Sequence, residues 1–230
     1  MRHGARAPSE DDAGFDVPLL ELTASGMRQR FLLGTFNRNR YVDQYKLLYS
    51  SDDVYVESTP VDRTYQSAYS ELMGMFPPGS LLENQKLTQT QLDGLKNDTR
   101  GMPPMNIRNA AAINSDLGRD PLPNGFVSVP VYSFEEPSMV DDISLTSCEY
   151  VNLVDGYRYP ANDTYTDYWY LCEDMKPAFQ IAFNLSDQYV QDMEFIDCYN
   201  WGDVVISREF EGVPLNYTYT SQELIEMNQT

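Results

Sequence analysis

The sequence indicates a domain that mixes helices with short strands, and three segments carry this prediction. Residues 53–58 alternate valine with larger or polar side chains, which is typical of a strand. A helix is expected directly afterwards, because Thr59 can cap it, Pro60 suits a first turn, and the prolines and glycine at 77–79 end the pattern. Residues 126–132 alternate in the same way and predict a second strand.

Two helices of the first third of the chain have clear patterns. The earlier one is predicted to begin at Thr23, as N-cap, and to run to about Tyr41. Its apolar side chains recur at helical spacing and indicate the buried face: Met27, Phe31, Leu32 and Leu33. Its arginines fall mostly off that face and are expected to be solvated: Arg28, Arg30, Arg38 and Arg40. The helix after Thr59 has one stripe expected to be buried: Tyr65, Ala68, Tyr69, Leu72 and Phe76.

The remaining segments give weaker patterns. Residues 79–120 are polar and predict irregular structure with short helical pieces. An aromatic-rich stretch that ends at Phe183 is expected to be helical beyond Glu173, and residues 192–201 are mixed. Thr220 looks like the start of a last helix. No internal repeat or clear linker separates these segments.

The composition narrows the class of partner. The chain has 230 residues, of which 42% are hydrophobic, so it can bury a core. Its formal net charge of -19 repels nucleic acid and anionic membranes. No apolar run is long enough to span a bilayer. An anionic ligand would therefore bind only where a local group of arginines outweighs the negative potential of the rest of the chain.

The first eight residues supply such a group. Arg2 and Arg6 flank His3, the single histidine of the chain, and Gly4 lets the backbone turn tightly beside it. A guanidinium binds phosphate oxygens through a fixed fork of donors, and an imidazole is a competent nucleophile near neutral pH. Arg63 falls in the first turn of the helix after Thr59, where free N–H groups and the helix dipole also favour an anion.

The order Arg-His-Gly-x-Arg-x-Pro at residues 2–8 resembles the signature of the histidine acid phosphatases. The block Ser58-Thr59-Pro60-Val61-Asp62-Arg63-Thr64 resembles a second family block. The resemblance covers the first half of the family's domain and implies that His3 is the catalytic nucleophile. It also implies that Arg2, Arg6 and Arg63 bind the phosphate.

The same resemblance implies an α/β fold. It is a partial three-layer α/β/α, phosphoglycerate mutase-like fold with a smaller, mostly helical cap, and edge strands are expected to be missing at both ends. Residues 1–80 would belong to the catalytic core, 81–200 to the cap and connecting segments, and 201–230 to the return towards the core. An upstream strand and a leader are expected to be absent, and the isolated chain is expected to aggregate or to fold loosely.

One part of the family's site has no counterpart here. The family's proton donor is an aspartate in a His-Asp pair, and this sequence has no histidine after His3. Little turnover of p-nitrophenyl phosphate is therefore expected from residues 1–230 alone. Three alternatives stay open: an incomplete acid phosphatase chain, a non-catalytic relative that binds phosphate or a protein, and a mutase-like cytosolic enzyme. The implied partner is a small phosphomonoester; no metal or cofactor is expected, and a homodimer is left open.

The compartment is predicted from glycosylation sequons and cysteines. Five Asn-x-Ser/Thr sequons, the last at Asn228, favour a secreted or lysosomal glycoprotein, and the candidate acceptors are Asn97, Asn162, Asn184 and Asn216. The three cysteines, at 148, 172 and 198, leave one unpaired if two form a disulfide. The family resemblance implies that Cys148 pairs with a cysteine beyond the present sequence.

Overall fold

A computed structural model describes residues 2–11, 13–46, 49–50, 52–96, 108–133, 163–215 and 217–218, and the side chains of 96 and 163–171 are not described. The chain divides into two compact units. Unit 1 comprises Met1–Gln29, Glu57–Ser67 and Tyr132–Thr230, and unit 2 comprises Arg30–Val56 and Ala68–Val131. Each unit is therefore assembled from segments that are far apart in the sequence.

Helices dominate the described part of the chain. Their bounds are α1 Ala24–Asn37, the π-helix η1 Arg38–Asp43, α2 Asp62–Met75, the 3₁₀ turn η2 Glu83–Gln85, α3 Gln89–Lys96, α4 Ala110–Leu117, the 3₁₀ turn η3 Pro123–Gly125, α6 Asp163–Phe183, α7 Asp187–Asp192 and α8 Phe195–Glu211. No helix among these is both long and apolar enough to cross a membrane.

The prediction of two β-strands, at residues 53–58 and 126–132, is wrong. Asp53 lies in a turn, and residues 54–58 and 126–132 meet only at a single parallel bridge between Glu57 and Tyr132 within the described ranges. Ser58 N–H donates to Tyr132 O at 2.9 Å, and no longer ladder forms within the described ranges. The alternating valines in both segments are instead used to pack against Leu72 and Phe76 of α2, in the apolar core of unit 2.

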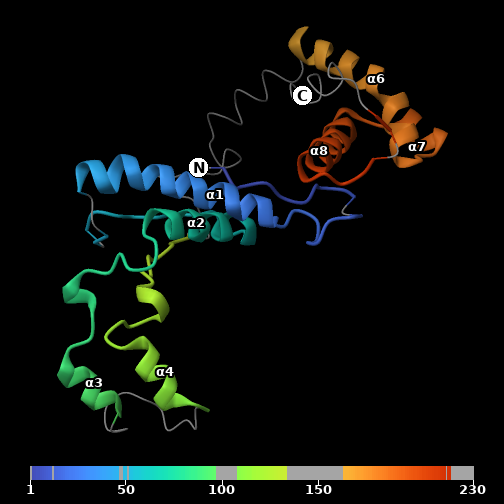
Figure 1. Cartoon of the computed structure of the whole chain (residues 1–230). Coiled ribbons are helices and arrows are strands. Elements are labelled where there is room, and N and C mark those ends of the chain that lie inside the picture. The colour runs from blue at the N-terminus through green and yellow to red at the C-terminus, as the bar shows by residue number, and fades with distance from the viewer. Residues whose placement is uncertain are drawn as a thin grey trace. The chain divides into compact units, whose positions relative to one another are not determined.

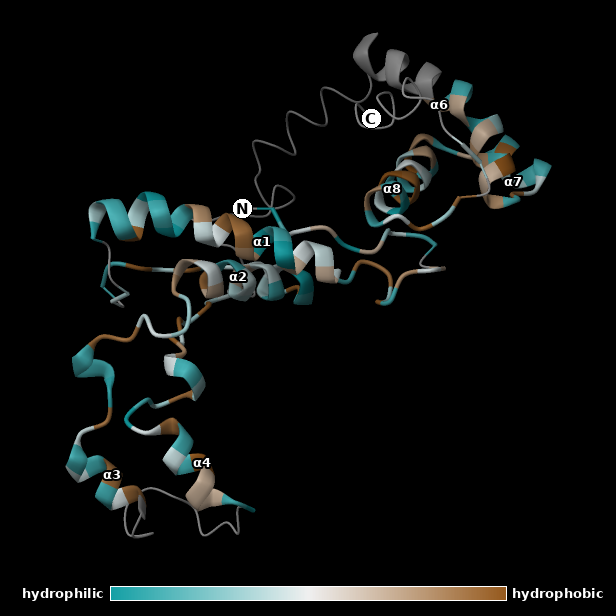
Figure 2. Ribbon diagram, viewed as in Figure 1, coloured by the Kyte–Doolittle hydropathy of each residue, from teal (hydrophilic) through white to brown (hydrophobic). Residues whose placement is uncertain are grey.

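Helix α1 begins where the sequence predicted and buries a different face. Gly26 N–H donates to Thr23 Oγ1 at 3.0 Å, which confirms the N-cap, and η1 continues the helical path to Asp43. The predicted apolar face is largely exposed, with Leu32 at 58%. Figure 2 shows hydrophobic colouring in the middle of α1.

The buried face of α1 within unit 2 is made of Arg30 and Gly34. Arg30, predicted to be solvated, is only 8% exposed and forms an ion pair with Glu71 of α2. A Cβ atom on Gly34 would collide with the backbone carbonyl of Glu71, and one on Gly74 would collide with that of Phe31. The two helices therefore touch backbone to backbone, and bulky side chains are excluded from their contact.

Helix α2 follows the prediction closely at its end and less closely at its start. It begins at Asp62 rather than at Pro60, and the Thr59 side chain donates to Thr64 Oγ1 at 3.1 Å instead of capping the helix. Leu72 and Phe76 are buried as predicted, whereas Tyr69 is exposed. The helix ends at Met75, just before the predicted stop at 77–79.

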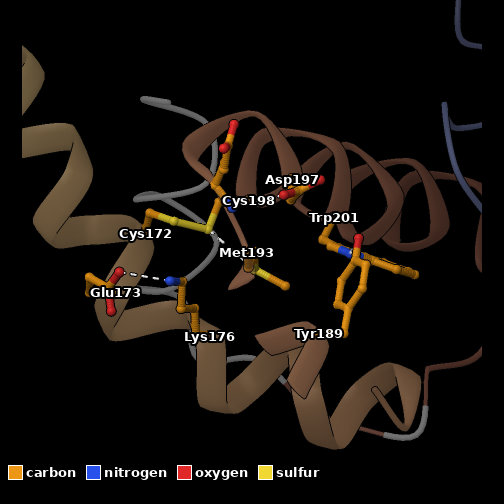
Figure 3. The surroundings of a disulfide bond; sticks show 9 residues. Cys172, Glu173, Lys176, Tyr189, Met193, Asp197, Cys198 and Trp201 are labelled. Carbon is orange, nitrogen blue, oxygen red and sulfur yellow. Dashed lines mark hydrogen bonds and ion pairs between the residues drawn. A yellow bond between two sulfur atoms is a disulfide. The ribbon is translucent and has the colours of Figure 1, made fainter. Parts of the chain in front are cut away.

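Helices α6, α7 and α8 form the apolar core of unit 1 (Figures 1 and 3). Phe179 and Val205 are fully buried at its centre. A disulfide joins Cys172 of α6 to Cys198 of α8, with Met193 beside it (Figure 3). Cys148 and the expected helix start at Thr220 lie outside the described residues. Sequence patterns predicted only the part of α6 beyond Glu173, and they missed α8, which begins at Phe195 within the segment described as mixed.

Candidate functional site

The N-terminal motif is an extended segment held against residues 20–23. Arg6 and Leu22 form an antiparallel bridge. The backbone hydrogen bonds around it are Ala7 N–H to Glu21 O at 2.9 Å, Leu20 N–H to Pro8 O at 3.1 Å, and Thr23 N–H to Ala5 O at 3.1 Å. The chain therefore doubles back before α1 begins, and the motif lies beside the first turn of that helix.

Gly4 and Gly26 allow this close approach. A Cβ atom on Gly4 would collide with the carbonyl group of Gly26, and a Cβ atom on Gly26 would collide with the carbonyl of Ala5. Only glycine leaves room for two backbones at this separation. Gly4 was predicted to allow a tight turn, and the structure shows that it is also required for packing against Gly26.

Ser67 connects the motif to the first turn of α2. It accepts a hydrogen bond from Gly4 N–H at 3.1 Å and donates one to Arg63 O at 2.6 Å. The side chain is 4% exposed, so both bonds are shielded from water. One hydroxyl thus brings the His3-Gly4 segment and the Arg63 turn into the same part of unit 1.

His3 has a defined tautomer. Its Nδ1 lies 2.7 Å from Gly4 O, and because a carbonyl oxygen can only accept, Nδ1 must carry the proton. The neutral ring then has its lone pair on Nε2. This is the arrangement that a nucleophilic imidazole needs.

The pKa of His3 is lowered from its ordinary value. Partial burial is the largest cause, and the positive charges of Arg6, Arg63 and Arg2 lower the pKa further. The hydrogen bond to Gly4 O acts in the opposite direction, since it favours the protonated ring. His3 therefore remains neutral to more acidic pH than a free histidine does.

The three predicted arginines are brought near His3 in different ways. Arg2 is exposed and Arg6 is partly buried, and both line a cavity with His3. Arg63 does not line that cavity, although its charge acts on His3. The Nε of Arg63 is buried and has no hydrogen-bond partner among the described residues. A buried donor without a partner is costly unless a ligand or water accepts from it.

An acidic residue that sequence reasoning missed holds Arg6. Asp203 of α8 accepts from Arg6 Nη1 at 2.9 Å and from Arg6 Nη2 at 3.1 Å, a bidentate ion pair. Its Oδ2 also accepts from Ser9 N–H at 2.9 Å. Helix α8 is tied to the N-terminal segment again through Arg208, whose Nη2 lies 2.7 Å from Asp11 Oδ2.

One face of α8 completes the cavity, whose volume is about 260 Å³. Its lining residues are Arg2, His3, Gly4, Ala5, Arg6, Gln29, Asp203, Ile206, Ser207 and Phe210. The four from α8 follow the spacing i, i+3, i+4 and i+7, which places them on one side of a helix. The same spacing can be read in the sequence. However, these four residues alternate polar and apolar side chains, so they do not form the continuous apolar stripe by which helical faces are recognised. The site thus has a cationic end and a partly apolar wall.

Comparison with known proteins gives one family. A sequence profile of the histidine phosphatase superfamily, branch 2, matches residues 1–115. Human testicular acid phosphatase is 40% identical over 93 residues, covering 35% of this chain and 22% of that protein. Mouse prostatic acid phosphatase is 37% identical over 85 residues, or 34% of this chain and 22% of that protein. Human lysosomal acid phosphatase is 37% identical over 91 residues, covering 35% of this chain and 21% of that protein.

These matches cover only about a fifth of each relative's length. The profile ends at residue 115, so it includes the motif, Arg63 and Ser67 but excludes Asp203 and the rest of α8. The α8 wall is therefore described from the structure alone.

Proposed function

Because the chain belongs to branch 2 of the histidine phosphatase superfamily, we propose that it carries the phosphate-binding part of an acid phosphatase-type site, in which His3 attacks phosphomonoesters. The observation that carries this proposal is the tautomer of His3. Its Nδ1 proton is held by Gly4 O, and partial burial together with the charges of Arg6, Arg63 and Arg2 lowers the pKa of the ring.

The chemistry is transfer of a phosphoryl group to nitrogen. Nε2 forms a bond to phosphorus while the P–O bond to the alcohol breaks, and water later displaces the histidine to release phosphate. Arg2, Arg6 and Arg63 would hold the non-bridging oxygens as charge moves to the leaving group. The charge of Arg63 acts on His3, which supports a place for Arg63 among the groups that hold the phosphate.

The proton for the leaving alcohol has no assigned donor. His3 is the single histidine of the sequence and serves as the nucleophile in this proposal. A poor leaving group needs a general acid, which contributes roughly 10²–10⁴-fold in typical enzymes. An activated leaving group does not, and this difference gives a direct test.

The test is a rapid-mixing assay with 2,4-dinitrophenyl phosphate, whose phenolate leaves without protonation. We expect a burst of up to one equivalent of dinitrophenolate and an acid-labile phosphate on His3, detected by mass spectrometry. p-Nitrophenyl phosphate should give a much smaller burst. His3→Ala should abolish the burst, and Arg28→Ala, which changes an exposed arginine of α1, should retain it. A burst that persists in His3→Ala would refute the nucleophile.

The second candidate is a relative that binds phosphate without turning it over. The single histidine favours it, because the same cationic cavity would bind an anion without releasing an alcohol. It predicts that inorganic phosphate binds with a stoichiometry of one, measured by calorimetry, while dinitrophenyl phosphate gives no burst. Loss of binding in both His3→Ala and Arg63→Ala would place the phosphate at the proposed site.

We further propose a secreted or lysosomal glycoprotein as the setting, as the names of the prostatic and lysosomal relatives suggest. Asn184 is exposed just after α6, and the Cys172–Cys198 disulfide suits an oxidising compartment. The asparagines of the other sequons lie outside the described residues. A mass shift after glycosidase treatment of the secreted chain would test glycosylation.

The three-layer α/β/α arrangement with a helical cap, the domain boundaries near residues 80 and 200, and a homodimer also remain part of the proposal.

A further inference from the structure

We propose that Asp203 is a positioning residue for the anion site, which fixes the Arg6 guanidinium so that its side-on edge faces a bound phosphate. The inference rests on the proposed function, because it concerns the same cationic cavity. Asp203 lies on α8, outside the residues that the family profile matches.

The hydrogen bonds of Arg6 support this role. Nη1 donates to Ala7 O at 2.9 Å and to Asp203 Oδ2 at 2.9 Å, so both of its hydrogens are used. Nη2 donates one hydrogen to Asp203 Oδ1 at 3.1 Å. Within the described residues, the second Nη2 hydrogen and the Nε hydrogen have no partner. These two hydrogens lie on one edge of the guanidinium and form the fork that binds two oxygens of a phosphate.

Asp203 is itself held in place. Its Oδ2 accepts from Ser9 N–H, and its side chain is 20% exposed on a helix anchored by a disulfide. A carboxylate that merely competed with phosphate would cover the donors that face the ligand. Asp203 covers only the terminal edge and leaves the side-on edge open.

The acidity of the chain makes such positioning useful. With a formal net charge of -19, a mobile arginine has many carboxylates to pair with, and Glu10 and Asp11 lie close by in the sequence. Fixing Arg6 in advance removes the entropy cost of ordering it when phosphate binds. The partial neutralisation of Arg6 by Asp203 opposes this gain, so the sign of the net effect is the decisive measurement.

The experiment measures the affinity of the full chain for inorganic phosphate by calorimetry in a double-mutant cycle. We expect Asp203→Ala to weaken phosphate binding about 2- to 12-fold, the effect of releasing one long side chain. In an Arg6→Ala background the same change should have no effect, because Asp203 acts through Arg6. Asn200→Ala is the matched control, since Asn200 on α8 also contacts Ser9 and Glu10 but does not touch Arg6.

The outcomes separate the two proposals. Unchanged or tighter binding in Asp203→Ala, or an equal loss in the Arg6→Ala background, would overturn the positioning role. Phosphate binding that is absent in the wild type, or insensitive to His3→Ala, would overturn the proposed function instead. The Arg6 Nε–H signal in ¹H–¹⁵N spectra tests the positioning role in that case too. It should be sharp in the wild type and in Asn200→Ala and broadened in Asp203→Ala; a sharp signal in Asp203→Ala would contradict the role.

Discussion

The two units each contain an arginine–carboxylate pair, and the pairs differ in what surrounds them. In unit 2, Arg30 and Glu71 are almost fully buried between α1 and α2, and Asn37 Nδ2 adds a hydrogen bond to Glu71 at 2.9 Å. In unit 1, Arg6 and Asp203 line a cavity beside His3. The comparison teaches that an ion pair between packed helices serves packing, whereas one at a cavity wall can hold a charge ready for a ligand.

The largest expected effect comes from breaking the buried pair. Glu71→Ala leaves the Arg30 charge buried without its partner, which should lower the free energy of unfolding by about 3–5 kcal/mol. The Arg30→Met/Glu71→Leu double variant, which replaces both charges by apolar groups, should recover most of that loss. Urea unfolding followed by circular dichroism measures both. Equal stability of Glu71→Ala and the wild type would mean that this pair is not structural.

The next effect separates the pairs by function. Arg6→Ala should weaken the binding of inorganic phosphate roughly 10- to 150-fold, because hydrogen bonds to a charged ligand are lost. The Arg30→Met/Glu71→Leu variant should bind phosphate as the wild type does. Calorimetry of the two variants, each with its unfolding curve, makes the comparison. Similar losses of affinity in both would refute the distinction.

The smallest effect is a shift in the pKa of His3. Burial and the cationic side chains disfavour the protonated ring, so the pKa of His3 in the folded chain should lie below 6.5. Its contribution to stability is therefore complete above pH 6.5 and declines as the pH falls towards the folded pKa, because the unfolded chain takes up the proton first. Arg6→Ala should raise this pKa, and Arg30→Met/Glu71→Leu should leave it unchanged.

The measurement is direct because the chain has one histidine, whose ring resonance can be titrated by NMR without assignment. Bound phosphate should raise the midpoint, since its negative charge offsets the arginines. A wild-type midpoint above 6.5 in the absence of phosphate would contradict the environment that the structure gives His3.

Sequence patterns predicted the parts of the molecule that depend on neighbouring residues. The Thr23 cap, the end of α2 before Pro77, and the helix that ends at Phe183 follow from local chemistry. The motif around His3 was also readable, since its residues are adjacent. What local rules could not supply was Asp203, which meets Arg6 across 197 positions of the chain.

The wrong face of α1 has a physical explanation. Hydrophobic periodicity assumes that the largest apolar side chains point inwards, but Gly34 and Gly74 bring two backbones together and leave no room for them. Arg30 then becomes buried because a partner carboxylate is within reach. The predicted strands failed similarly, since their valines contact α2 whereas a β-ladder would need several successive residue pairs.

The contact between Gly4 and Gly26 has a consequence for how this site can vary. The backbone at Gly4 lies directly against the backbone at Gly26 in α1, so α1 fixes the position of the segment that carries His3. A methyl group added at Gly4 or Gly26 would collide with this neighbouring backbone and shift the segment. Ligand preference therefore cannot be adjusted at Gly4 or Gly26 themselves. The other lining side chains, among them Ile206, Ser207 and Phe210 of α8, make no such backbone contact and are the positions where ligand preference can vary.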